Sequence, residues 1–172
     1  MADASYPIGR FQFPDTVTPA MRGQWLDDIA QTPSRIRSAL EALNTAQIDS
    51  PYRPGGWTAR QVVHHVADSH MNSYIRCRLA LTEDEPLVKP YHEDRWARLT
   101  DASEAPVELS LSLLDALHHR WMILLRSLSP EEMQRTFRHP EMGLMTIEKN
   151  IALYSWHGKH HTAHIGLCAR PG

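Results

Sequence analysis

The chain has 172 residues, which fits one domain that is long enough to bury a core. Its formal net charge is −2 with both signs mixed, so it has no basic patch that would indicate nucleic acid as the main partner. No apolar run approaches the roughly 20 residues of a membrane span, and the start MADASYPIGRF lacks a signal pattern. We therefore expect one soluble, cytoplasmic domain over residues 1–172, with a small molecule rather than nucleic acid or membrane as its partner.

The first half of the chain predicts two long helices. Apolar side chains from Met21 to Leu43 recur at three- and four-residue steps, and Pro33 within this run predicts a kink or a break. The stretch SPYRPGGW is typical of a loop because of its proline and glycine content. Thr58 then caps a second helix, which we expect to reach about Leu81.

The second half predicts two more long helices. Residues 91–99 indicate a short helix inside a long connection, and residues 108–128 indicate the third long helix. Residues 135–146 alternate weakly in polarity, which is typical of either a small hairpin or a loop. Thr146 opens the fourth helix, which runs to the C-terminus. The sequence therefore predicts an all-α four-helix bundle with a long crossover connection. Bundles with apolar outer faces often pair, so we also expect a homodimer.

Histidines are concentrated in two stretches, GGWTARQVVHHVADSH and WHGKHHTAHI, each on a predicted helix. A helix brings residues four apart onto one face, so either His157 with His161 or His160 with His164 can point two imidazoles at one ion. A third imidazole from a distant segment would complete a facial set with open positions, as in catalytic metal sites.

The ordinary alternative to a metal site is a polar surface rich in histidine. Two observations favour the metal. The second cluster lies in an otherwise apolar segment, so part of it faces inward, where unpaired polar groups are costly. The helix of the first cluster also carries Asp68, a carboxylate of the kind that fixes the tautomer of a metal-binding imidazole.

Further candidate residues share faces with these histidines. Steps of three and four residues place His65, Asp68, Asn72 and Arg76 on one stripe of the second helix. We interpret Asp68 as an orienting or acid–base residue, and Asn72 and Arg76 as contacts to the polar part of a substrate, since arginine suits carboxylate or phosphate. Tyr154, one turn before His157, is either a proton donor or a core tyrosine with a satisfied hydroxyl.

The run GGWTARQVVHHVADSHMNSYIR, followed about eighty residues later by LYSWHGKHHTAHI, resembles the DinB/YfiT-like superfamily. The closest likeness is to its YfiT-like branch of metal-dependent hydrolases, which includes bacillithiol transferases. The segments SYPIG, YRPGGW and ALHHRW extend the resemblance over most of the chain. The resemblance implies a four-helix bundle that binds one divalent ion, commonly zinc or nickel, through one histidine of the second helix and two of the fourth.

The resemblance also implies a ligand set. The family's ligand in the second helix falls eight residues after a tryptophan, which from Trp57 gives His65. Its pair in the fourth helix has the spacing HxxxH, which matches His157 and His161. The same spacing fits His160 and His164, and His64 adjoins His65, so the set His64, His160 and His164 remains the alternative.

Three reaction classes are compatible with such an ion. A bound water made acidic by the ion gives hydrolysis of an ester, amide or similar bond, although no HExxH motif supplies a general base. A bound low-molecular-weight thiol such as bacillithiol gives S-transfer to an electrophile. A fourth protein ligand, such as His164 or Cys168, would instead favour a non-enzymatic metal-binding bundle.

Overall fold

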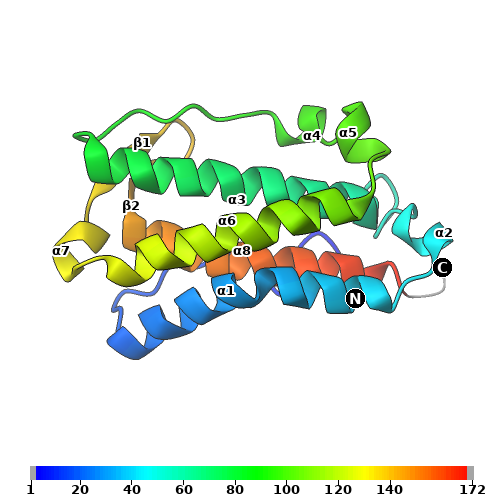
Figure 1. Cartoon of the computed structure of the whole chain (residues 1–172), viewed down its shortest axis with the longest axis horizontal. Helices are drawn as coiled ribbons and strands as arrows, with labels where there is room; N and C mark the ends of the chain where they lie inside the picture. The colour runs from blue at the N-terminus through cyan, green and yellow to red at the C-terminus, as the bar shows by residue number, and fades with distance from the viewer. Residues whose placement is uncertain (1–2, 170–172) are drawn as a thin grey trace.

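Four long helices lie side by side along the long axis of the protein in this computed structural model, which describes residues 3–169 (Figure 1). They are α1 (Pro19–Glu41), α3 (Ala59–Thr82), α6 (Val107–Ser127) and α8 (Ile147–Leu167). Helices α1 and α3 each pack against both α6 and α8, so they occupy opposite corners of the bundle. The predicted four-helix bundle is confirmed.

Side-chain caps begin the long helices where the sequence indicates. The Thr58 side chain accepts from the backbone N–H of Gln61, and the Gln61 side chain accepts in return from the backbone N–H of Thr58, which is a complete capping box. Thr146 caps α8 by accepting from the N–H of Lys149. The two helices that carry the histidine clusters therefore begin at defined residues. Each cap thus sets which side of its helix each histidine faces.

Helix α1 continues through Pro33 as one helix, so the break expected from this proline does not occur. A proline inside a helix has no N–H to donate to the carbonyl four residues earlier. The carbonyl of Ile29 therefore lacks its helical donor, and the ring nitrogen Nδ1 of His118 on α6 lies 2.8 Å from it instead. The bundle compensates the missing hydrogen bond with a side chain.

The long crossover is confirmed as the connection between α3 and α6. Residues 83–106 return along the outside of the bundle, so that α3 and α6 run in the same direction (Figure 1). The crossover contains the short helices α4 (Glu93–Trp96) and α5 (Thr100–Ser103). Two further short helices, α2 (Thr45–Ile48) and α7 (Pro130–Met133), lie at the ends of long ones.

Of the two alternatives for residues 135–146, a hairpin or a loop, the structure has the hairpin. Strands β1 (Thr136–His139) and β2 (Gly143–Thr146) pair antiparallel directly before α8. The backbone N–H of Val88 donates to the carbonyl of Arg138 at 2.9 Å, so the crossover is attached to the hairpin. The crossover also contacts α3 directly, because Arg76 donates to the carbonyl of Lys89.

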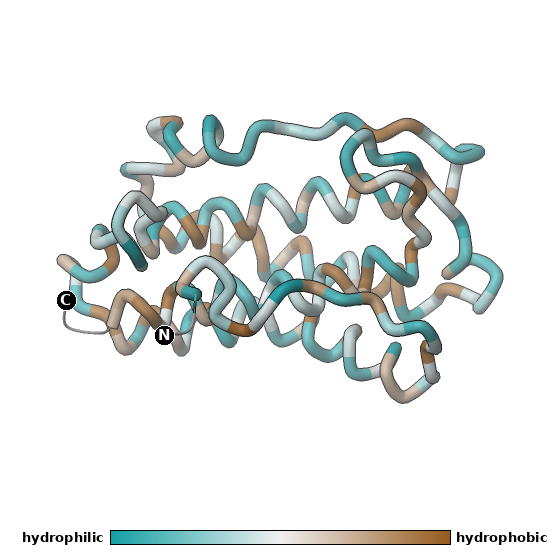
Figure 2. The backbone as a smooth tube through the Cα atoms, turned by 180° about the vertical axis from the view of Figure 1, so that it is seen from behind, coloured by the Kyte–Doolittle hydropathy of each residue, from teal (hydrophilic) through white to brown (hydrophobic). Residues whose placement is uncertain are grey.

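Two apolar clusters form the core, one including Trp121 and Phe137 and the other including Val63 and Leu114. Polar side chains also point into the bundle from every long helix: Thr32 on α1, His70 on α3 and His118 on α6 are buried, and His157 on α8 is half-buried. Figure 2 shows hydrophobic positions recurring along the helices, with the N-terminal segment passing across them. No helix within residues 3–169 is long and apolar enough to cross a membrane.

Candidate metal centre

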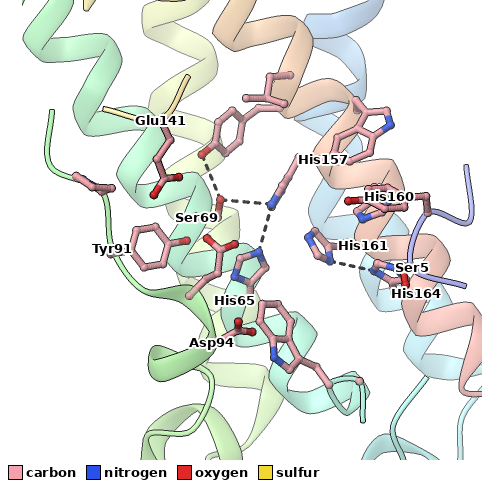
Figure 3. A pocket seen from close by; sticks show the side chains of 18 of the residues that line it. Ser5, His65, Ser69, Tyr91, Asp94, Glu141, His157, His160, His161 and His164 are labelled. Carbon is pink, nitrogen blue, oxygen red and sulfur yellow. Dashed lines mark hydrogen bonds between the residues drawn. The ribbon is translucent and has the colours of Figure 1, made fainter. Parts of the chain in front are cut away.

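Three imidazoles from two helices converge at one point (Figure 3). His65 projects from α3, and His157 and His161 project from α8. One ligand atom from each lies within 4.8 Å of those of the other two, and the Nε2 atoms of His65 and His157 are 3.3 Å apart. We call these three residues the three-histidine centre.

The centre fits a divalent ion in both distance and protonation. Two nitrogens bound tetrahedrally at about 2.0–2.1 Å from zinc are about 3.3–3.4 Å apart, which matches the separation of the His65 and His157 nitrogens. Burial and then the charges of neighbouring histidines lower the pKa of His65 to about 3. Burial likewise holds the pKa of His157 and His161 well below the usual value, so all three rings are neutral ligands at pH 7.

The alternative set is not brought together. The Nδ1 atom of His64 lies 2.7 Å from the hydroxyl of Ser110 on α6, and its Nε2 lies 3.1 Å from the carbonyl of Ala105. His64 therefore faces α6 and the crossover, away from the three-histidine centre. His160 and His164 do approach His161, and these three form a second group with ligand atoms within 4.8 Å of one another.

His164 fixes the tautomer of His161. Its Nε2 lies 3.1 Å from the carbonyl of Ala4, and a carbonyl only accepts, so the proton of His164 is on Nε2. Its Nδ1 then accepts from Nδ1 of His161 at 3.3 Å. The proton of His161 is thereby placed on Nδ1, which leaves the Nε2 lone pair free for an ion.

A cavity of about 630 Å³ opens over the three-histidine centre. Helices α3 and α8 form two of its walls, and the crossover and the hairpin contribute others. The crossover and the hairpin line it mainly with polar side chains, namely Tyr91, Glu93, Asp94, His139 and Glu141. The histidines are therefore accessible to a small molecule.

One buried polar atom beside the centre is unpartnered. His160 is 6% exposed and stacks on Trp156 with 4.3 Å between ring centroids. Its Nδ1 atom has no hydrogen-bond partner among the described residues. Because such atoms are costly to bury, this one marks a place where a bound group or water would be stabilised.

Two of the predicted functional residues line the cavity. The hydroxyl of Tyr154 lies 3.2 Å from Oγ of Ser69, and burial raises the Tyr154 pKa, so the phenol keeps its proton. Arg76 is 9% exposed and donates to the carbonyl of Lys89 at 3.3 Å. Arg76 thus connects α3 to the crossover at the cavity wall.

The other two lie outside the lining within the described part of the chain. The Asn72 amide donates to the Asp68 carbonyl at 2.9 Å, so it supports its own helix. The side chain of Asp68 is half-buried near Asp101; burial, and then the charge of Asp101, raise its pKa to about 6. Successive helical residues point about 100° apart, so Ser69 faces the cavity where the sequence stripe had placed Asp68. Direct substrate contact by Asn72 is not supported by this placement.

Sequence reasoning missed three residues that face the centre. Ser69, whose Oγ is 3.4 Å from Nε2 of His157, follows His65 by four residues, and this spacing was an available signal. Tyr91 and Glu141 come from the crossover and the hairpin, and Figure 3 shows both beside Ser69 and His65. No local pattern marks either of them.

Comparison with known proteins agrees with the fold and the centre. The family model described as the DinB superfamily matches residues 28–165. This chain belongs to the DinB superfamily. A relative from Oceanobacillus iheyensis, named "Putative metal-dependent hydrolase", is 54% identical over 166 residues, which cover 96% of each chain. A relative with the same kind of name from Bacillus mycoides is 52% identical over 96% of this chain and 95% of its own.

A solved structure of a DinB-like protein extends the agreement to three dimensions. YfiT from Bacillus subtilis is described as "a probable metal-dependent hydrolase with an unusual four-helix bundle topology". It is 44% identical to this chain, covers 97% of it with 96% of its own length, and superposes with a TM-score of 0.93. The family and the bundle expected from the sequence are confirmed, including the crossover that makes α3 and α6 parallel.

Proposed function

We propose that this DinB-superfamily protein is a metal-dependent hydrolase of small molecules that holds one divalent ion, zinc or nickel, in the three-histidine centre. The carrying observation is the convergence of three neutral imidazoles at the floor of an open cavity, with His65 and His157 separated by the distance that zinc imposes. The names of the curated relatives support the same reaction class.

The surroundings favour catalysis over metal storage. His164 uses its two ring nitrogens on His161 and Ala4, and the Cys168 thiol donates to the carbonyls of Ser50 and His164. Neither residue suggested as a closing fourth ligand is therefore free to close the site. The three-histidine centre opens onto the cavity, from which water or a substrate could reach a bound ion.

When bound, a divalent ion held by three neutral ligands lowers the pKa of a bound water and polarises a substrate oxygen. Tyr154 supplies a neutral phenol at the same place, because its hydroxyl reaches Ser69, which in turn reaches His157. We propose that this phenol donates a hydrogen bond to the oxygen on which charge develops. Asp68 stays a predicted acid–base residue: its pKa of about 6 suits proton exchange near pH 7, but it lies outside the cavity lining.

We propose Arg76 as the anchor for an anionic part of the substrate. One of its nitrogens is used by the Lys89 carbonyl, which fixes the guanidinium at the cavity wall. Arg76→Ala should raise KM while leaving metal content unchanged, and Asn72→Ala on the same helix is the matched comparison. Equal loss in both variants would restore Asn72 as a substrate contact.

The deciding experiment assays the zinc- and nickel-loaded protein against activated esters and amides, with and without a low-molecular-weight thiol. We expect hydrolysis without thiol, abolished by chelation, restored by the metal, and absent in His157→Ala. Product formed only when both a thiol of the bacillithiol type and an electrophile are present would replace the hydrolase with an S-transferase. Inactivity in both assays, with metal bound, would leave a metal-binding bundle.

We also propose that the protein is a cytoplasmic homodimer. Leu109 and Leu113 of α6 are 64% and 43% exposed one turn apart, and this apolar stripe supports pairing through α6. Cys77 and Cys168 are both buried free thiols in the described structure, which suits a reducing compartment. Leu109→Glu with Leu113→Glu should convert a dimer to a monomer in sedimentation experiments, whereas a monomeric parent protein would refute the pairing.

A further inference from the structure

We propose that two buried histidines, His70 and His118, hold His157 in the single tautomer that presents Nε2 to the ion. They form a relay of hydrogen bonds that begins at the carbonyl of Ile29, which has no helical donor because of Pro33, and ends at His157. His70 and His118 are positioning residues, since neither reaches the cavity. Their importance for metal binding rests on the proposed function, whereas the tautomers themselves do not depend on it.

The anchor fixes the first proton. Because Pro33 has no N–H, the carbonyl of Ile29 receives no helical donor and instead faces Nδ1 of His118 at 2.8 Å. A carbonyl only accepts hydrogen bonds, so the His118 proton is on Nδ1. The ring is 2% exposed, and burial keeps it neutral, so its Nε2 is an acceptor.

The relay carries this choice to the metal ligand. His118 Nε2 lies 2.9 Å from Nδ1 of His70, with the two ring planes 10° apart, so His70 donates through Nδ1. His70 Nε2 is then an acceptor, and it lies 3.2 Å from Nδ1 of His157. The proton of His157 must be on Nδ1, and its Nε2 lone pair points to His65 and the centre.

The opposite arrangement is disfavoured at both ends of the relay. Reversing the relay would turn the Nδ1 lone pair of His118 toward the Ile29 carbonyl oxygen, two acceptors 2.8 Å apart in the core. It would also place a proton on Nε2 of His157, where an ion must bind. In sequence the three residues that determine this outcome, Pro33, His70 and His118, are far apart, and they meet only through α1, α3 and α6.

The primary test is nitrogen-15 NMR of the imidazole rings in the metal-free protein. We expect His118, His70 and His157 all to carry their proton on Nδ1, which separates their nitrogen shifts from those of exposed His119. A proton on Nε2 of His70 or His157 would overturn the proposal. This measurement requires neither metal nor activity.

The second test uses His118→Phe, which keeps a flat ring against Trp121 and removes the acceptor for His70. The matched control is His119→Phe, which alters the exposed neighbour on the same helix. We expect the affinity for zinc alone to fall in His118→Phe by about 10–100-fold, the range for lost partners of metal-binding histidines, because His70 can then turn its proton toward His157, and to stay unchanged in the control.

The outcomes separate the two proposals. Unchanged zinc affinity and unchanged His157 tautomer in folded His118→Phe would refute the relay. Relay tautomers in a wild-type protein that binds neither zinc nor nickel would refute the metal-dependent function and leave the relay intact. If His118→Phe does not fold, the tautomers of the wild-type protein decide by themselves.

Discussion

The two proposed metal ligands of α8, His157 and His161, are oriented by two different chains of hydrogen bonds. His157 is backed by His70 and His118, and this chain ends on a helical carbonyl inside the bundle. His161 is backed by His164, and this shorter chain ends on the carbonyl of Ala4 in the N-terminal segment. Both chains place the proton on Nδ1 and free Nε2. One ligand therefore depends on the packing of four helices, and the other depends on a segment laid across them.

The largest expected effect concerns the three proposed ligands themselves. His65→Ala, His157→Ala and His161→Ala should each lose nearly all zinc, because three protein ligands are the minimum for such a site. The matched control is His64→Ala, adjacent to His65 but bonded to Ser110 and Ala105, which should keep zinc while losing some stability. Metal analysis of the purified variants checks this. Retained zinc in the three, with loss in His64→Ala, would establish the alternative ligand set.

The next effect is the dependence of stability on pH that comes from His118, in the hydrogen-bond chain behind His157. Burial lowers the pKa of His118 to about 4, below the roughly 6.5 of an unfolded histidine, so the unfolded chain takes up a proton first as pH falls. Stability of the metal-free protein should be complete above about pH 6.5 and fall as pH drops toward 4. At about 1.4 kcal/mol for each pKa unit, this one residue contributes a loss of about 3 kcal/mol.

His118→Phe should remove that share of the pH dependence, whereas His119→Phe should retain it. Denaturant unfolding of the metal-free variants at pH 7 and pH 5 measures both slopes. Identical slopes in the parent protein and His118→Phe would show that His118 is not buried as a neutral ring, and so would weaken the contrast between the two chains.

The hydrogen bonds from His161 to His164 and from His164 to Ala4 should matter less for metal binding than those behind His157. His164→Phe keeps the stacking on Tyr52, where the ring centroids are 4.1 Å apart, but removes the acceptor for His161. We expect zinc affinity to fall by less than about tenfold, at or below the low end of the usual range, because His164 lines the cavity, where water can take over its hydrogen bond to His161. Calorimetric titration with zinc, in parallel with His118→Phe, checks the order. A larger loss of zinc affinity in His164→Phe than in His118→Phe would show that His161 depends more on its partner than His157 does.

The smallest effect concerns Asp68, which follows His65 by three residues on α3 and belongs to neither chain of hydrogen bonds. Its folded pKa of about 6 exceeds the unfolded value of about 3.9, so ionisation destabilises the fold as pH rises from 4 to 6. Asp68→Asn should therefore stabilise the metal-free protein by about 1–2 kcal/mol at pH 7, after allowance for its partial exposure, and by little at pH 4. Equal effects at both pH values would contradict the raised pKa.

Helical periodicity and capping signals in the sequence were sufficient to predict the bundle. The apolar spacing, the capping residues Thr58 and Thr146, and the loop before Trp57 predicted the long helices to within a few residues. Pro33 predicted a kink or a break, and the structure excludes the break, because tertiary packing stabilises a continuous helix despite the missing hydrogen bond. These predictions succeeded because they depend on neighbours three and four residues away.

The sequence by itself also determined that histidines four apart on α8 share a face, but it left two ligand sets open. In the tertiary structure the side chains of one set converge and those of the other do not, because the direction of a side chain depends on which neighbouring helix its face meets. Thus His65 faces the cavity while adjacent His64 faces Ser110. Adjacent helical residues point about 100° apart, and for this reason Ser69, and not Asp68, faces the three-histidine centre.

Only the tertiary structure decided how the ligands are supported. No sequence pattern links Pro33, His70 and His118, because residues that meet only through tertiary hydrogen bonds have no characteristic spacing in the sequence. Packing α1, α3 and α6 together excludes water from these rings, and each buried donor must then find a defined acceptor. That requirement, applied from the Ile29 carbonyl outward, sets the orientation of the proton on His157.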